Sequence, residues 1–104
     1  MIAEAIVCLA LNTYHEAKNQ SRTGQVAVAE VVMNRVKDKR YPNNVCDVVK
    51  QGLTYKWNPK IPIRHQCQFS WYCDGKSDKA REKKAWKDAL TVARGVYYGY
   101  LTAH

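Results

Sequence analysis

Hydrophobic residues recur at helical spacing in several stretches of the chain. The first stretch covers residues 2–14, where Ile6 and Leu9 lie three positions apart in an apolar segment. This spacing places side chains on one face and predicts an amphipathic helix. A second such helix ends near the C-terminus, and Ser77 or Asp78 is expected to cap it. Its apolar stripe consists of Trp86, Ala89, Leu90, Ala93, Val96 and Tyr97.

A helix is also expected between these two, from Ser21 or Thr23 to about Lys39. A Ser or Thr hydroxyl can accept a hydrogen bond from the free amides of a first helical turn. The valine-rich composition of this stretch is compatible with a strand as well. Its length and the basic residues at its C-terminal end favour a helix, because cations interact well with the negative end of the helix dipole.

Turn-forming residues dominate the region between the middle and last helices. Asn43 or Asn44 is expected to cap a short helix over residues 45–50. From Gln51 to Gly75, glycine, proline and aromatic residues interrupt every period. We therefore expect a long irregular segment with a short extended stretch at residues 67–71. Long segments of this kind in small domains usually carry function.

Composition limits the class of protein. A chain of 104 residues with 46% hydrophobic and 25% charged residues is expected to form a single folded domain over residues 1–104. Its apolar runs are too short to span a membrane, and its start shows no signal peptide, so we expect synthesis in the cytoplasm. The net charge of +8 favours anionic partners. The basic residues are scattered, so no nucleic-acid partner is expected.

Neither the cysteines nor the histidines form a metal-binding pattern. The cysteines are Cys8, Cys46, Cys67 and Cys73, without a C-x-x-C pair. Cys8 is expected to be a buried thiol in a helix. The other cysteines could supply one disulfide, but reduced thiols are expected in the cytoplasm. Because His15, His65 and His104 have no zinc-site spacing relative to them, we expect no metal and no cofactor.

Three segments stand out together. They are HEAKNQSRTGQVAVAEVVMNRV (His15–Val36), YPNNVCDVV (Tyr41–Val49) and CQFSWYCDG (Cys67–Gly75). Their order and wording resemble the SleB/CwlJ-like cell wall hydrolases, which include spore-cortex-lytic enzymes and many phage and bacterial relatives. The resemblance covers about residues 2–99. It implies a mainly α (α+β) fold, a compact helical domain like lysozyme and the lytic transglycosylases, with a small β element. The family pattern continues beyond the end of this chain, so its C-terminal segment is expected to be absent.

The resemblance also implies a reaction. It is the cleavage of peptidoglycan between N-acetylmuramic acid and N-acetylglucosamine, in the manner of a lytic transglycosylase. The catalytic glutamate of the family, in its Glu-Ala motif, corresponds to Glu16, which would serve as general acid and base. From its position alone, Glu16 would be a surface charge paired with Lys18 or Arg22. The surrounding motif favours the catalytic interpretation.

Residues near the motifs are candidates for sugar binding, because aromatic rings stack on sugars and amides or hydroxyls bind their polar groups. These candidates are Tyr14, His15, Gln25, Gln68, Ser70 and Trp71. The plainer interpretation places Phe69 in the core, which is what we expect for it, and leaves Trp71 half-buried. One of Tyr14 and His15 is expected to pack inward. Arg35 is expected to make buried hydrogen bonds that orient the loop after Glu16. Glu30 is expected at the surface, close to a basic residue one turn away.

Other functions remain open at the level of sequence. The alternatives are an N-acetylmuramoyl-L-alanine amidase, which would need zinc, and a non-catalytic wall-binding remnant. A nucleic-acid-binding domain would rest on charge alone. The main expectation is a monomeric enzyme that acts on the glycan strands of the bacterial cell wall. A phage endolysin would reach them through a holin.

Overall fold

The amphipathic stretches form the long helices of the protein. The structure is a computed structural model in which residues 1–103 are described. Helix α1 spans Ile2–Ala17, α2 spans Arg22–Lys37 and α4 spans Lys83–Tyr97. Helix α1 therefore extends three residues further than its apolar pattern indicates. Helix α4 begins at Lys83, so the predicted cap at Ser77 or Asp78 is wrong, and the intervening residues cross to the end of α1 instead.

The caps of the middle helices follow the sequence. The Ser21 hydroxyl accepts a hydrogen bond from the Gly24 amide at the start of α2. Asn44 does the same for Asp47 at the start of α3, which spans Val45–Val49. A cap of this kind contributes about 1 kcal/mol to helix stability. Polar side chains placed just before an apolar run thus define both helix starts.

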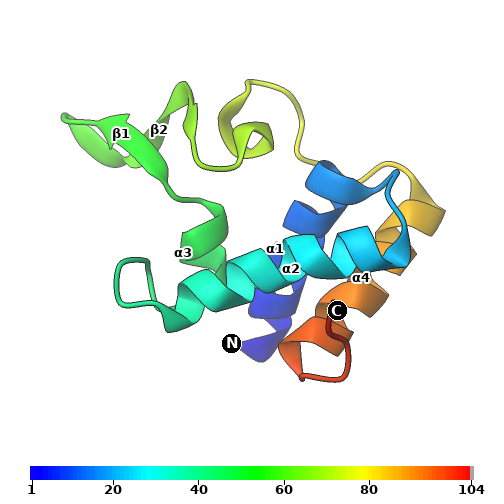
Figure 1. The fold of residues 1–104 in the computed structure, drawn as a ribbon. Helices are drawn as coiled ribbons and strands as arrows, with labels where there is room; N and C mark the ends of the chain where they lie inside the picture. The colour runs from blue at the N-terminus through cyan, green and yellow to red at the C-terminus, as the bar shows by residue number, and fades with distance from the viewer. Residues whose placement is uncertain (104) are drawn as a thin grey trace.

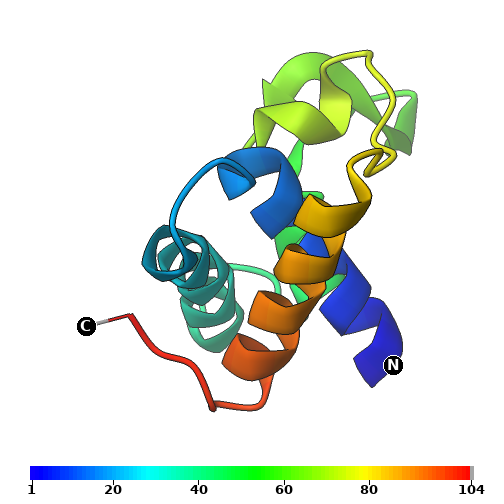
Figure 2. The same cartoon turned by 90° about the vertical axis from the view of Figure 1, so that its right-hand side faces the viewer.

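The core lies where α1 packs against α2 and α4, and α3 closes one end of it. Figures 1 and 2 show the helices gathered on one side of the molecule, with the β-strands at the other end. The core side chains are small and aliphatic, which allows the helices to approach closely. Those with at most 1% exposure are Leu9, Ala10, Ala29, Val32, Val48, Val49, Ala89, Val92 and Ala93.

A β-hairpin occupies most of the segment that was predicted to be irregular. Strand β1 spans Gly52–Tyr55 and pairs antiparallel with β2, Asn58–Cys67. The stretch predicted to be extended is partly a 3₁₀ turn, η1, Ser70–Cys73. The pattern missed the hairpin because both of its faces are largely exposed, so apolar and polar residues do not alternate cleanly along it. The overall prediction of a mainly α fold with a small β element is confirmed.

The cysteines are oxidised in the structure, which corrects the expectation of reduced thiols. Cys8 bonds to Cys46 and links α1 to α3, and Cys67 bonds to Cys73 across the end of β2 and η1. Spacing along the chain could not indicate the first pair, because its partners are 38 positions apart and meet only when α3 docks on α1.

The chain after α4 folds back onto the helices. The Tyr100 and Leu101 amides both donate to the Gly95 carbonyl, and the Leu101 side chain fills the space where a Cβ of Gly95 would lie. The Ala103 amide donates to the Glu30 carboxylate at 2.8 Å. Glu30 therefore binds this returning segment and not a base on its own helix. Within the described residues, no helix is long and apolar enough to cross a membrane.

The longer disulfide is expected to stabilise the domain more than the shorter one. Because its loop contains 38 residues, the chain-entropy estimate for the C8A/C46A variant is a loss of about 4 kcal/mol in the free energy of unfolding. The Cys67–Cys73 disulfide closes a much shorter loop. The C67A/C73A variant should therefore lose about 2 kcal/mol in the free energy of unfolding. Guanidinium denaturation of both variants measures the difference. An equal or reversed ranking would contradict the role assigned to the α1–α3 link.

Candidate active site

Glu16 lies in the last turn of α1 with its side chain exposed to solvent. Its neighbours Tyr14 and Ala17 are buried, because they lie on the face of α1 that packs into the protein. Among the described residues Glu16 has no hydrogen-bond partner and no ion pair. Lys18, a partner expected for a plain surface charge, is paired with Glu82 at 3.3 Å. The carboxylate is therefore unengaged by protein groups.

Trp71 packs against the same end of α1. Its ring stacks on that of His15, with centroids 4.6 Å apart and planes 18° from parallel. The Trp71 indole Nε1–H donates to Asn12 Oδ1 at 2.8 Å in a buried hydrogen bond. Asn12 lies one helical turn before Glu16, so these contacts attach η1 to the turn that carries the glutamate. Trp71 is thus a wall of the site rather than a freely exposed ring.

The segment before α4 packs against this end of α1 as well. The Asp78 carbonyl lies 2.8 Å from His15 Nε2. Because a carbonyl can only accept, this nitrogen of His15 carries the proton. The Glu82 amide donates to the Tyr14 hydroxyl at 3.1 Å, and Tyr14 is the residue of the Tyr14–His15 pair that packs inward. These bonds place residues 78–82 beside α1.

Gln25 is buried at the start of α2, close to the loop that follows Glu16. Its amide Nε2 donates to the Gln20 carbonyl at 3.3 Å, and its Oε1 is buried without a hydrogen-bond partner among the described residues. The side chain therefore braces the α1–α2 loop.

Gln68 and Ser70 are exposed on the loop that the Cys67–Cys73 disulfide closes. The backbone amide of Gln68 donates a hydrogen bond to the backbone carbonyl of Gln51 at 2.9 Å, which ties this loop to the base of the hairpin. Gln68 also lines a shallow hollow of about 230 Å³ with residues from both strands. Both polar side chains remain available to a ligand.

Arg35 contacts aromatic rings, whereas hydrogen bonds that orient the loop after Glu16 were predicted for it. Its guanidinium lies 5.1 Å from the Tyr41 ring centroid and 5.4 Å from that of Phe69. Cation–π contacts of this kind attract Tyr41 and Phe69 to α2. Its Nη1 atom is buried without a partner among the described residues. Phe69, as expected, packs against the core.

Asp78 is a carboxyl group near the site that the sequence did not indicate. Burial raises its pKa above the ordinary value of 3.8, and the charge of His15 opposes that change. No local pattern indicates that Asp78 lies near His15, because this position depends on the path of the chain across the end of α1. Asn12 could have been found, since it lies one turn from Glu16 on an otherwise apolar helix.

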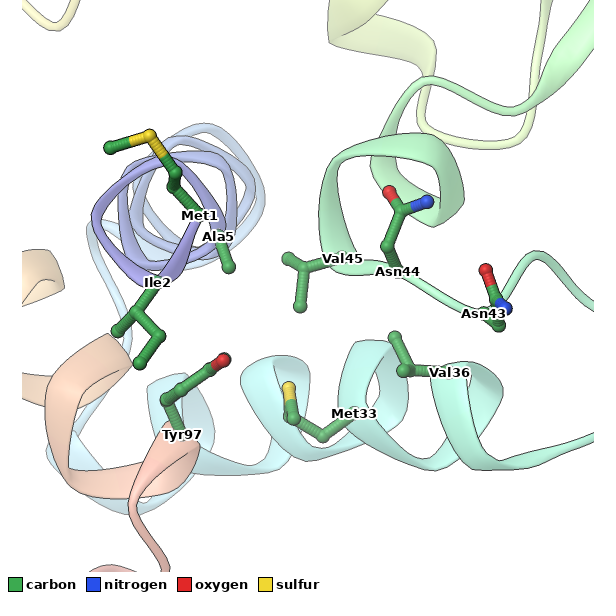
Figure 3. A pocket seen from close by; sticks show the side chains of 9 residues that line it. All are labelled: Met1, Ile2, Ala5, Met33, Val36, Asn43, Asn44, Val45 and Tyr97. Carbon is green, nitrogen blue, oxygen red and sulfur yellow. The ribbon is translucent and has the colours of Figure 1, made fainter.

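A second hollow lies at the opposite end of α1 and does not include this site. It has a volume of about 560 Å³. Figure 3 shows its lining of mostly apolar side chains from both ends of the chain and the ends of the helices. Ile2, which lines it, is separated from Glu16 by about 21 Å of helix, at about 1.5 Å per residue. Its lining offers no carboxylate for acid catalysis.

The described residues hold no cluster of three or more His, Cys, Asp or Glu side chains that is arranged for a metal ion. All four cysteines are engaged in disulfides. His104 lies outside the described residues.

A mainly helical domain with an exposed glutamate at the end of a helix, next to a histidine that stacks on a tryptophan, fits the class of small cell-wall-degrading domains. The family described as Cell Wall Hydrolase matches residues 19–104, and the chain belongs to that family. The match begins three residues after Glu16. The match confirms the family resemblance that the sequence motifs indicate.

Two curated relatives are spore cortex-lytic enzymes. One, from Halalkalibacterium halodurans, is 38% identical over 50 residues, which is 48% of this chain. The other, from Bacillus subtilis, is 38% identical over 47 residues, or 45% of this chain. The matched segment spans 15% of the length of each relative. No solved structure matches the chain.

The Trp71–Asn12 hydrogen bond is expected to stabilise the attachment of η1 to α1. In Trp71→Phe a smaller aromatic ring remains, but the buried Asn12 Oδ1 loses its donor. The free energy of unfolding should fall by about 1–3 kcal/mol. Urea denaturation of the variant measures this loss. Trp86→Phe, on a half-buried ring with no indole hydrogen bond among the described residues, is the matched control and should lose less.

Asp78 is expected to make stability depend on pH. Since its pKa is raised in the folded state, folding favours the protonated form, and this contribution is lost as pH rises through the folded-state pKa. Asp78→Asn should therefore gain in melting temperature relative to wild type at pH 7, and the gain should shrink below pH 3.8, where the wild-type carboxyl is protonated in both states. Melting curves across this range measure it. A difference independent of pH would contradict the assignment.

Proposed function

We propose that this domain cleaves the glycan strands of peptidoglycan as a lytic transglycosylase, with Glu16 as its single catalytic acid and base. The observation that carries the proposal is the unpaired, exposed Glu16 carboxylate at the end of α1, beside a wall formed by His15 and Trp71. Family membership and the similarity to spore cortex-lytic enzymes support a wall substrate.

The proposed reaction needs one carboxyl group. Protonated Glu16 gives its proton to the glycosidic oxygen between N-acetylmuramic acid and N-acetylglucosamine, and the bond from C1 to that oxygen breaks. The resulting carboxylate then takes the proton of the muramoyl 6-hydroxyl, while the oxygen of this hydroxyl forms a bond to C1. A 1,6-anhydro product forms, no water is consumed, and Glu16 regains its proton.

The remaining candidates divide into contact and support roles in this proposal. Gln68 and Ser70 are exposed and would hydrogen-bond sugar hydroxyl and acetamido groups. His15, which is half-buried and stacks on the buried Trp71 ring, would pack on a sugar ring. Tyr14 and Gln25 are buried and would hold the end of α1 in place. In this proposal the exposed polar side chains contact the substrate, and the two buried side chains support the end of α1.

The biological setting extends the same proposal. A monomer that acts at the bacterial cell wall fits a phage endolysin that depends on a holin for access. Its net charge of +8 would favour approach to an anionic wall. The partner is the peptidoglycan strand, with neither nucleic acid nor cofactor involved.

Glu16→Gln is expected to abolish turnover on purified sacculi. The amide cannot donate a proton to the leaving oxygen, so the rate should fall by at least 100-fold, as for loss of a general acid. Mass spectrometry of the products should show 1,6-anhydromuropeptides with wild type and none with the variant. Glu82→Gln, which removes a carboxylate at the same end of α1, is the matched control and should retain activity.

The products separate the competing functions. Free stem peptides would indicate an amidase, and reducing sugar ends would indicate hydrolysis with water as nucleophile. Sacculus binding without any product would indicate a non-catalytic wall-binding domain. An active Glu16→Gln variant would show that another residue is the acid.

A further inference from the structure

The β-hairpin carries an exposed apolar surface that the proposed reaction does not use. Figure 1 shows β1 and β2 projecting from the helical body, away from α2 and α4. Trp57, at the turn, is 72% exposed and Leu53 is 62% exposed. The Tyr55 and Trp57 rings lie 5.4 Å apart, so the tip presents a joint aromatic surface. Such a cluster of exposed apolar side chains on a small protein marks an interaction surface.

The hairpin also exposes aliphatic residues near its aromatic tip. Thr54 pairs with Pro62, and the register shifts on both sides of this pair. Leu53 and Ile61 each directly precede a member of the pair, so both lie next to the paired residues. Ile61 is exposed as well, at 38%. The hairpin therefore presents aliphatic side chains together with its aromatic tip.

The charges around this surface have one sign. Between Asp47 and Asp74 the chain has no acidic residue. Over the same interval it has the bases Lys50, Lys56, Lys60 and Arg64. Lys56 and Lys60 flank the exposed Trp57, and both are exposed. The partner of this surface must therefore be anionic and must also accept aliphatic groups.

We propose that the hairpin binds the surface of an anionic phospholipid bilayer. Trp and Tyr rings prefer the headgroup region, and lysines attract the phosphate groups while their alkyl stems lie along the apolar boundary. A glycan could stack on the aromatic rings, but it offers no apolar medium for Leu53 and Ile61. The binding is peripheral and does not depend on the wall-cleaving activity.

Vesicle co-sedimentation tests the proposal. The Glu16→Gln protein is mixed with vesicles of phosphatidylcholine alone, or of phosphatidylcholine with phosphatidylglycerol. It should bind the anionic vesicles preferentially, and salt should weaken this binding. Adding K56Q/K60Q should reduce partitioning by roughly 30-fold, since each base near an anionic surface contributes roughly fivefold. Adding K83Q/K87Q, which changes the net charge equally on α4, should leave it near the starting value.

An aromatic pair of variants tests the apolar part. Trp57→Ala should lower vesicle binding, whereas Tyr100→Ala should not, although Tyr100 is 84% exposed. Circular dichroism verifies that each variant is folded. Equal binding to neutral and anionic vesicles, or equal losses in the control variants, would overturn the proposal. If Lys56, Lys60 and Trp57 are needed to bind purified sacculi and vesicles are not bound, the surface recognises a wall polymer and the lipid assignment is wrong.

Discussion

The buried contact between Trp71 and Asn12 is the interaction on which the arrangement of this domain depends. Few residues of the hairpin and η1 are buried, and a two-stranded sheet of this size is marginal in water. Trp71 provides a buried apolar ring, a hydrogen bond to α1 and a stack on His15. Without that attachment, Gln68 and Ser70 would have no defined position relative to Glu16.

Other contacts strengthen the same attachment from neighbouring directions. Arg35 on α2 attracts Phe69, and the Cys67–Cys73 disulfide closes the loop that contains Phe69. The Asp78 carbonyl accepts a hydrogen bond from His15. The end of α1 is thus held by Trp71 from η1 and by Asp78 and Glu82 from the segment before α4. Glu16 lies at this junction and is exposed to solvent, with no hydrogen bond or ion pair from residues 1–103.

The domain separates its surface into regions of different chemistry. The end of α1 combines carboxyl, amide and aromatic groups, which suit a sugar substrate. The hairpin combines lysines with exposed aliphatic and aromatic side chains, which suit an anionic interface. An enzyme that worked between a membrane and a wall would use both surfaces at once, with the hairpin setting the distance at which the catalytic end meets the glycan.

The sequence by itself determined the helices, a cap at Ser21 or Thr23 and another at Asn43 or Asn44, and the family, because periodicity, capping and motif wording are local properties. It also pointed to Glu16 as the candidate acid. Only the tertiary structure decided the hairpin pairing, the disulfide partners, the inward packing of Tyr14 and the approach of Asp78 to His15. Each of these depends on contacts between residues distant in the chain, whose gain in free energy appears only after the helices have packed. The predicted cap at Ser77 or Asp78 was wrong for that reason: a strong local preference for a cap yielded to the tertiary packing of residues 78–82 against α1.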